Sequence, residues 1–136
     1  MPTAREFTIQ LEDKPGTLGK CCRALAEKGV NILAFQSFPL AGKSNVRFVA
    51  DNPTTAKTVL DSQRMTYTEA QVAQTKLVHR PGEIARAASR LGEANINIDY
   101  AYVGIEPGTN TPLFICGVAN ATQAAKILDE AAAAAA

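Results

Sequence analysis

The stretch Asp13-Lys14-Pro15-Gly16-Thr17-Leu18, followed by Gly29-Val30-Asn31-Ile32, decides the fold because the chain contains it twice. The second copy is His79-Arg80-Pro81-Gly82-Glu83-Ile84, followed by Asn95-Ile96-Asn97-Ile98. Pro81 lies 66 residues after Pro15 (81 − 15), and Asn97 lies equally far from Asn31, so no insertion separates the two anchors within a copy. A repeat of this period predicts a duplicated small domain. We place the two copies at residues 1–71 and 72–136.

The composition is that of a compact soluble protein and favours no polyanionic partner. Apolar residues make up 46% of the chain, charged residues 20%, and the formal net charge is +1. Nucleic acid and anionic lipid are therefore not expected partners. The first residues lack the apolar segment of a signal peptide, and no apolar run approaches membrane-spanning length, so we expect a cytoplasmic location. We interpret the three cysteines as small buried hydrophobic residues, not as a metal or redox site.

Each copy is expected to begin with strand, helix, strand and strand. Phe7, Ile9 and Leu11 alternate with polar residues, as in a half-buried strand, and Thr75 and Leu77 continue this phase in the second copy. A helical stripe follows at Leu18, Cys21, Cys22, Leu25 and Ala26, and again at Ile84, Ala87, Ala88 and Leu91. Gly29 and Asn95 suit the left-handed conformation at a helix end. Predicted hairpins join 32–38 to 46–50 and 98–103 to 114–118.

The end of each copy predicts a second helix, and the two copies then differ. Asn52 and Asn120 precede helical segments and are expected N-caps. Residues 66–72 are a predicted fourth strand that runs almost directly into the first strand of the second copy. The counterpart of this strand would begin at position 134, where the chain is Ala131 to Ala136. We expect the helix to continue through these alanines, leaving the first strand of the second copy with an unpaired edge and favouring a homodimer.

The predicted order of strand, helix, strand, strand, helix, strand is that of an α+β protein. It corresponds to a ferredoxin-like βαββαβ unit, an antiparallel sheet with its helices on one face. The chain would contain two such units, and the second would lack its last strand.

The two Pro-Gly loops, each followed by a helix and an Asn-Ile turn, resemble the ACT domain, a small regulatory module attached to aspartate kinases and other amino-acid-controlled enzymes. The resemblance runs from about Arg5 to Glu130. It implies the βαββαβ fold, side-by-side pairing of domains, allosteric regulation of a partner enzyme of amino-acid metabolism, and amino-acid binding where domains meet. The chain departs from the family pattern at its alanine-rich end.

The loops and turns also favour an amino-acid site on physical grounds. A Pro-Gly turn lets backbone approach a ligand, and the N–H groups that open a helix favour a carboxylate. An asparagine carboxamide can bind both an ammonium group and a carboxylate. The two features lie a helix length apart, about 18 Å for twelve residues, so one small ligand would need different units or chains to contribute them. The predicted ligand-binding residues are Asp13, Lys14, Pro15, Gly16, Thr17, Leu18, Asn31, Ile32, Arg80, Pro81, Gly82, Glu83, Ile84, Asn97 and Ile98.

Structural roles for these residues stay open. Either Pro-Gly pair can be a turn that sets strand-to-helix geometry, and either asparagine can satisfy backbone groups after the helix. His79 is interpreted as an exposed loop residue, with ligand contact as the second reading. Tyr100 and Tyr102 share a strand face and are assigned to sheet packing, and Arg64 is assigned to solvent.

Catalysis is not expected, because the chain has no Cys-X-X-Cys, no histidine pair, no phosphate-binding glycine loop and no serine nucleophile motif. A carboxylate pair drawn from Asp13, Asp99 and Glu83 is the remaining catalytic reading. We therefore predict a regulatory amino-acid sensor that needs no metal or cofactor. The alternative is a structural or protein-interaction module of the same fold that binds no ligand.

Overall fold

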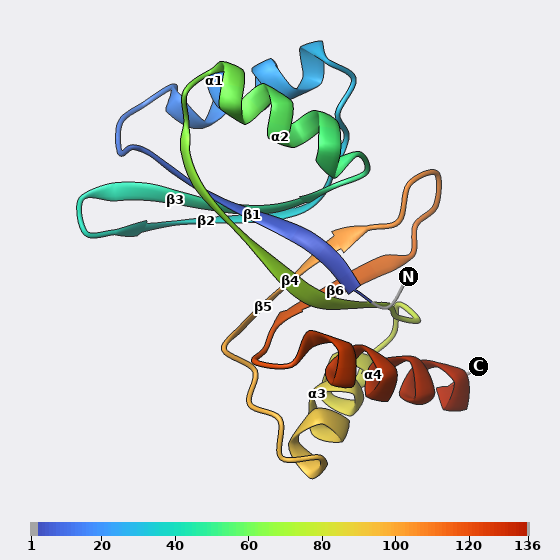
Figure 1. Ribbon diagram of the computed structural model, residues 1–136. Coiled ribbons are helices and arrows are strands. Elements are labelled where there is room, and N and C mark those ends of the chain that lie inside the picture. Colours follow the sequence, from blue (N-terminus) through green and yellow to red (C-terminus); the bar gives the residue numbers. More distant parts are fainter. Residues whose placement is uncertain (1–2, 136) are drawn as a thin grey trace. The chain divides into compact units, whose positions relative to one another are not determined.

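The computed structural model describes residues 3–135, which form six strands and four helices (Figure 1). In chain order these are β1 (Thr3–Glu12), α1 (Thr17–Glu27), β2 (Ile32–Leu40), β3 (Lys43–Ala50), α2 (Pro53–Ser62), β4 (Thr66–Lys76), α3 (Glu83–Glu93), β5 (Tyr100–Ile105), β6 (Pro112–Gly117) and α4 (Ala121–Ala135). The pairs β1–β3, β2–β3, β4–β6 and β5–β6 are antiparallel. The predicted α+β class with ferredoxin-like units is confirmed.

The chain divides into two compact units, and each is described by itself. The N-terminal unit is Arg5–Ala70, and the C-terminal unit is residues 71–135 together with Thr3 and Ala4. The division falls inside β4, which is one continuous strand. The prediction that the fourth strand of the first copy runs directly into the first strand of the second is therefore confirmed.

The N-terminal unit has the strand order β2-β3-β1-β4, with α1 and α2 together on one face (Figure 1). Phe7 lies opposite Phe48 in the β1–β3 pairing, and their rings stack at 5.4 Å between centroids. The alternation of β1 sends Phe7 and Ile9 into the core, where Leu25 of α1 and Leu60 of α2 cover them. This one-sided burial explains why β1 reads as a half-polar strand.

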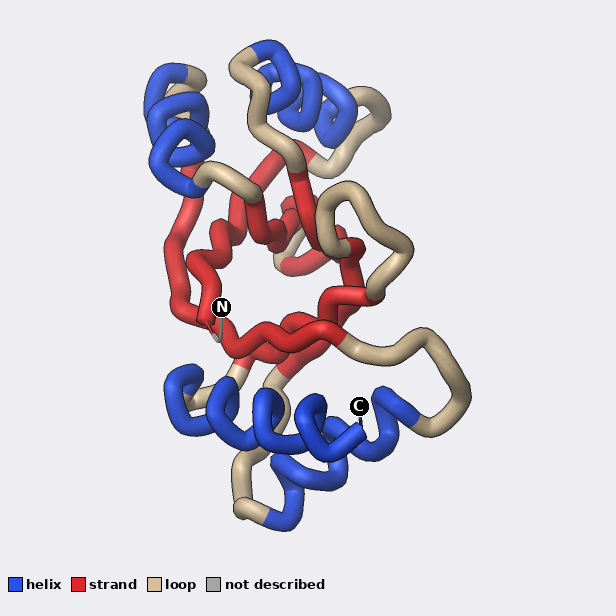
Figure 2. The backbone as a smooth tube through the Cα atoms, turned by 90° about the vertical axis from the view of Figure 1, so that its right-hand side faces the viewer, coloured by secondary structure: helices blue, strands red, loops and turns tan. Residues whose placement is uncertain are grey.

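The C-terminal unit has the order β4-β6-β5, with α3 and α4 side by side on its strands (Figure 2). Its core contains Leu91 of α3, Leu128 of α4, and Phe114 and Cys116 of β6, each at most 3% exposed. The two helices therefore cover one face of this smaller set of strands, as α1 and α2 do in the other unit.

Helix α4 continues through the alanines as predicted, as far as the described residues reach. It runs from Ala121 to Ala135, and Ala131 is buried. Ala136 lies outside the described residues. Within residues 3–135 no strand follows α4, so the expected loss of the fourth strand of the second copy is borne out there.

The prediction about the unpaired edge is wrong in its location. β4 has β1 as a neighbour on the side away from β6, and the Gln71 side-chain amide donates to Thr3 Oγ1 at 3.2 Å. The strands that lie at an edge are β2 in the N-terminal unit and β5 in the C-terminal unit. The sequence pattern shows that the fourth strand of the second copy is missing, but it does not show which strand lies beside β4 in its place.

The helix ends follow local sequence. Gly29 and Asn95 have φ of 73° and 61°, the predicted left-handed conformation. Asn52 and Asn120 are N-caps, since their side-chain oxygens accept from the backbone N–H groups of Thr55 and Gln123. These four predictions are confirmed.

The helical stripe of α1 differs from its prediction at one position. Cys21 and Leu25 are buried and Cys22 is half-buried, but Ala26 is exposed, and Ala24 packs against the core instead. Burial raises the pKa of Cys21 to about 11 and that of Cys116 in β6 to about 12. Both thiols are therefore protonated at neutral pH, as expected of small buried hydrophobic residues.

The second Asn-Ile turn delays the start of its strand. β5 begins at Tyr100 and not at Ile98. Before it, the Asp99 N–H bonds to the Gly117 carbonyl, and the Asn97 amide donates to the Asp99 carboxylate at 3.0 Å. The rings of Tyr100 and Tyr102 stack at 6.5 Å, which agrees with their assigned role in sheet packing. No helix among the described residues is both long and apolar enough to cross a membrane.

Candidate functional site

The two Pro-Gly loops have the same backbone conformation. We call residues 13–18 the N-terminal loop and residues 79–84 the C-terminal loop. Gly16 and Gly82 are the N-cap residues of α1 and α3, with φ of 92° and 89°. The side-chain-free glycine is needed here, because this region of φ is unfavourable for residues with a Cβ.

Both loops therefore deliver an uncapped helix N-terminus. No side chain caps α1 or α3, whereas Asn52 and Asn120 cap α2 and α4. The Thr17 hydroxyl, in the first turn of α1, turns back into the loop and donates to the carbonyls of Glu12 (2.8 Å) and Lys14 (3.1 Å). The Thr17 N–H bonds to the Lys14 carbonyl at 3.5 Å, and the next N–H groups of this turn, those of Leu18 and Gly19, are left to bind an acceptor from outside.

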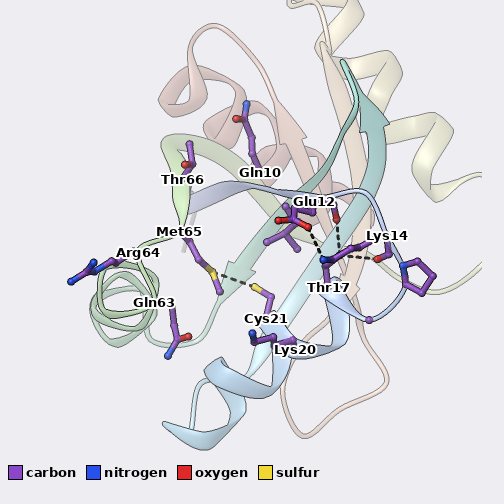
Figure 3. A pocket seen from close by; sticks show the side chains of 13 residues that line it. Gln10, Glu12, Lys14, Thr17, Lys20, Cys21, Gln63, Arg64, Met65 and Thr66 are labelled. Carbon is purple, nitrogen blue, oxygen red and sulfur yellow. Dashed lines mark hydrogen bonds and ion pairs between the residues drawn. The ribbon is translucent and has the colours of Figure 1, made fainter.

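A pocket of about 620 Å³ lies at the N-terminal loop, entirely within the N-terminal unit (Figure 3). The loop and the start of α1 form one wall, and the turn after α2 forms the opposite wall. The Cys21 thiol donates to Met65 Sδ at 3.7 Å between these walls. The lining residues are Gln10, Leu11, Glu12, Lys14, Pro15, Gly16, Thr17, Lys20, Cys21, Gln63, Arg64, Met65 and Thr66.

Charges of both signs meet in this N-terminal pocket. Lys14 Nζ lies 2.8 Å from Glu12 Oε2, with the two side chains 63% and 66% exposed. The hydrogen bond from Lys14 lowers the pKa of the Glu12 carboxyl, and Glu12 in turn raises the pKa of Lys14. An ion pair this exposed contributes little stability, so both groups can exchange partners for a charged ligand. Lys20 forms no ion pair within residues 3–135.

The C-terminal loop has a different pocket, of about 550 Å³ and within the C-terminal unit. Its walls are mainly apolar, and the side chains of Val78, Ile84 and Val103 are each about half exposed. The lining residues are Leu77, Val78, His79, Arg80, Pro81, Gly82, Glu83, Ile84, Ala85, Val103 and Pro112. His79 is exposed, as expected of a loop residue.

The charged groups of the C-terminal loop bind one another. The Glu83 residue is only 5% exposed, and its carboxylate accepts from Arg80 Nε at 2.7 Å and from Arg86 Nη2 at 3.2 Å. Arg80, and secondly Arg86, hold the pKa of this carboxyl below its ordinary value. Arg86 Nη1 also donates to the Ala131 carbonyl of α4 at 2.6 Å.

The predicted Asn-Ile turns lie away from both pockets. Asn31 follows α1 at the end opposite its loop, and its backbone N–H bonds to the Asp51 carboxylate at 3.0 Å. Asn31 and Asn97 are exposed, whereas Ile32 and Ile98 pack partly against the cores of their own units. Neither unit by itself therefore combines a loop and an asparagine in one pocket.

The wall opposite the N-terminal loop was not predicted from the sequence. Gln63, Arg64, Met65 and Thr66 line this pocket, and Arg64 has a positive φ of 54°. Glu12 and Lys20 flank the repeated motif and were missed as well. The signal that points to Lys20 and Glu12 is their charge beside the motif, but nothing local to residues 63–66 indicates that they face the loop. Asp13 and Leu18 do not line the pocket.

The residues considered for a metal site or for catalysis do not come together within residues 3–135. His, Cys, Asp and Glu side chains form no group of three suited to a metal ion. Two of the three carboxylates considered for catalysis bind other side chains. Glu83 lies between Arg80 and Arg86, and Asp99 accepts a hydrogen bond from Asn97.

Comparison with known proteins identifies a family and several similar folds. A family model described as an ACT domain pair matches residues 3–135. No curated protein sequence matches the chain. Among solved structures, protein BT0572 from Bacteroides thetaiotaomicron has a TM-score of 0.81 at 22% identity, over 94% of this chain and 88% of that one. The ligand-free regulatory subunit of aspartate kinase from Thermus thermophilus has a TM-score of 0.65 at 18% identity, over 96% and 92%. Its counterpart from Thermus flavus has 0.62 at 16%, over 96% and 93%. At these identities the likeness is one of fold.

Proposed function

The chain belongs to the ACT family as a pair of ACT domains, and we propose that it is a regulatory protein that binds a free amino acid at the N-terminal pocket. Occupancy of that pocket would be passed to a partner enzyme of amino-acid metabolism. Two of the similar solved structures are regulatory subunits of aspartate kinase, and this description supports an enzyme of amino-acid metabolism as the partner. Their likeness to this chain is one of fold.

The observation that carries the proposal is the combination of an uncapped helix N-terminus, the Lys20 ammonium without an anionic partner in the described residues, and the exposed Glu12–Lys14 ion pair. The first-turn N–H groups of α1 and the Lys20 ammonium would bind the α-carboxylate of the ligand. The Glu12 carboxylate, released from Lys14, would accept from the α-ammonium group. A free amino acid carries these two groups a few Å apart. It therefore matches a pocket in which Glu12 precedes the loop and Lys20 lies in the first turns of the helix that follows it.

A second copy of the chain would complete the site. Asn31 and the N-terminal loop lie at opposite ends of α1, which at eleven residues spans about 16 Å. Two chains related by a two-fold axis, with their α1 helices antiparallel, would bring Asn31 of each copy to the loop of the other. The edge strand β2 carries exposed Phe35 and Leu40, at 48% and 60%, which suits such pairing.

An interaction module without a ligand is the second candidate. The observation that favours it is the group of half-exposed apolar side chains Val78, Ile84, Val103 and Ile105 in the C-terminal unit. Apolar side chains clustered on a surface suit a protein partner. This candidate predicts that no amino acid changes the stability of the chain.

A thermal-shift screen against the twenty amino acids distinguishes the two candidates. A ligand at one hundred times its dissociation constant stabilises the folded state by roughly 2.7 kcal/mol. For a chain of 136 residues that unfolds cooperatively, this corresponds to a rise in Tm of roughly 9 °C. A screen in which no amino acid raises Tm would contradict the proposed sensor and leave the interaction module.

Asparagine variants test the shared site, and sedimentation tests the dimer. We expect Asn31→Ala to weaken amino-acid binding with little change in Tm, because the Asn31 side chain forms no hydrogen bond within the described residues. Its backbone bond to Asp51 does not depend on the side chain. A large fall in Tm with unchanged affinity would show that Asn31 is structural. A chain that sediments as a monomer at micromolar concentration, with and without the amino acid, would contradict the shared site.

A further inference from the structure

The two Pro-Gly loops are equivalent in backbone but not in their available charges. In both, the residue after glycine donates to the carbonyl three positions earlier at 3.5 Å, Thr17 to Lys14 and Glu83 to Arg80. The first i to i−4 bonds of the two helices are 3.1 Å and 2.9 Å long. Any difference in ligand binding between the loops must therefore come from side chains.

The C-terminal loop places a carboxylate where a ligand carboxylate would bind. Glu83 takes the position of Thr17, in the first turn of the helix, and is almost completely buried. A negative charge there already interacts favourably with the helix N-terminus. A second carboxylate brought to this position would be repelled by Glu83.

The cations of the C-terminal loop are also occupied. Arg80 and Arg86, which take the positions of Lys14 and Lys20, both bind Glu83, and Arg86 is held to the Ala131 carbonyl as well. Ala131 is available because α4 continues through the region where the N-terminal unit has its turn after α2. Val78 stands in the place of Glu12, so the loop also lacks an acceptor for an ammonium group.

The N-terminal loop keeps the opposite set of features. Thr17 directs its hydroxyl to loop carbonyls and leaves the helix N-terminus open, and Lys20 has no anionic partner within residues 3–135. Its pocket walls carry polar side chains, among them Gln10 and Glu12, where the C-terminal pocket is mainly apolar.

From this contrast we infer that only the N-terminal loop binds the charged main-chain groups of an amino acid, so that each chain takes up one ligand molecule. The C-terminal loop is a duplicated copy whose arginines and Glu83 close it to zwitterions. This inference rests on the proposed function, since it states which of the two loops performs it.

Isothermal titration calorimetry of the full-length chain tests the inference. The ligand is the amino acid that gives the largest rise in Tm in the screen of twenty. We expect one ligand per chain in the unaltered protein. Lys20→Gln removes a charged hydrogen-bond donor and should weaken binding by about tenfold or more. The control variant Arg80→Gln, in the C-terminal loop, should change the dissociation constant by less than about twofold, which is below 0.5 kcal/mol.

The outcomes separate the inference from the proposed function. Two ligands per chain, or equal weakening by Lys20→Gln and Arg80→Gln, would overturn the inference and leave the amino-acid sensor standing. Absence of binding for all twenty amino acids would overturn the sensor and the inference together. Circular dichroism of both variants checks that they are folded, and an additional variant, Glu12→Gln, which removes the acceptor of the ligand ammonium group, repeats the test at the N-terminal loop if Lys20→Gln does not fold.

Discussion

Replacing Gly16 by alanine should lower stability and ligand affinity together, whereas the same change at Gly82 should lower stability alone. Both glycines have φ near 90°, where a residue with a Cβ is strained. A Cβ at either position would meet no atom within 4 Å, so the cost is conformational and does not include a clash. A left-handed conformation costs about 1–2 kcal/mol for a residue with a side chain.

The expected fall in Tm follows from the size of the chain. Unfolding entropy is about 2.1 cal/mol/K per residue, or about 0.29 kcal/mol/K for 136 residues. Each variant should therefore lose about 3–7 °C in Tm, less the small gain from the reduced flexibility of the unfolded chain. Differential scanning calorimetry of both variants measures this loss, and the two losses should agree because the two backbone conformations agree.

Affinity separates the two variants. Gly16 lines the N-terminal pocket, so its added methyl group should hinder the approach of a ligand to the α1 N-terminus and weaken binding, while Gly82→Ala should leave the dissociation constant unchanged. Gly16→Val, with a larger and β-branched side chain, should be worse on both counts. Unchanged Tm in Gly16→Ala would refute the strain argument, and equal loss of affinity in Gly16→Ala and Gly82→Ala would refute the assignment of the site to one loop.

Three further outcomes test the structure. Glu83→Gln should be less stable than the unaltered protein at pH 7, because the arginines lower the pKa of Glu83 in the folded state. The stability that the charged Glu83 adds should be lost as pH falls from about 4.3 through that lower pKa. Urea unfolding that gives the same stability difference between variant and unaltered protein at pH 7 and at pH 3 would contradict the ion-pair account. Asn52→Ala removes the cap of α2 and should cost about 1 kcal/mol, whereas a neutral result in urea unfolding would show that the cap contributes nothing. Iodoacetamide at pH 8 should modify Cys22 before Cys21 and Cys116, whose pKa values burial raises to about 11 and about 12, and peptide mapping that finds Cys116 modified first would contradict the buried core.

Much of the fold could be predicted from the sequence because its signals are local. The alternation in β1, the caps at Asn52 and Asn120, and the left-handed residue Asn95 each depend on a few neighbouring residues, and the 66-residue period shows that such local patterns recur. The helical continuation through Ala131 also follows from the propensity of alanine. These features are set by backbone geometry that a short segment adopts by itself.

The neighbours of each element were not predictable in the same way. The sequence suggested an unpaired edge on the first strand of the second copy, but β4 lies beside β1, and the edge strands are β2 and β5. Strand pairing joins segments far apart in the chain, so it depends on which contacts are made and not on the pattern of one segment.

The same division applies to the candidate site. Sequence repetition identified both Pro-Gly loops and suggested that they are alike, which their backbones are. Only the tertiary structure brought residues 63–66 opposite the N-terminal loop and placed the Ala131 carbonyl against Arg86. The repeated sequence determines the backbone conformation of each loop, because the glycine and the helix that set this conformation belong to the repeat. The charges that remain free for a ligand depend instead on every side chain and carbonyl that folding brings within hydrogen-bonding distance.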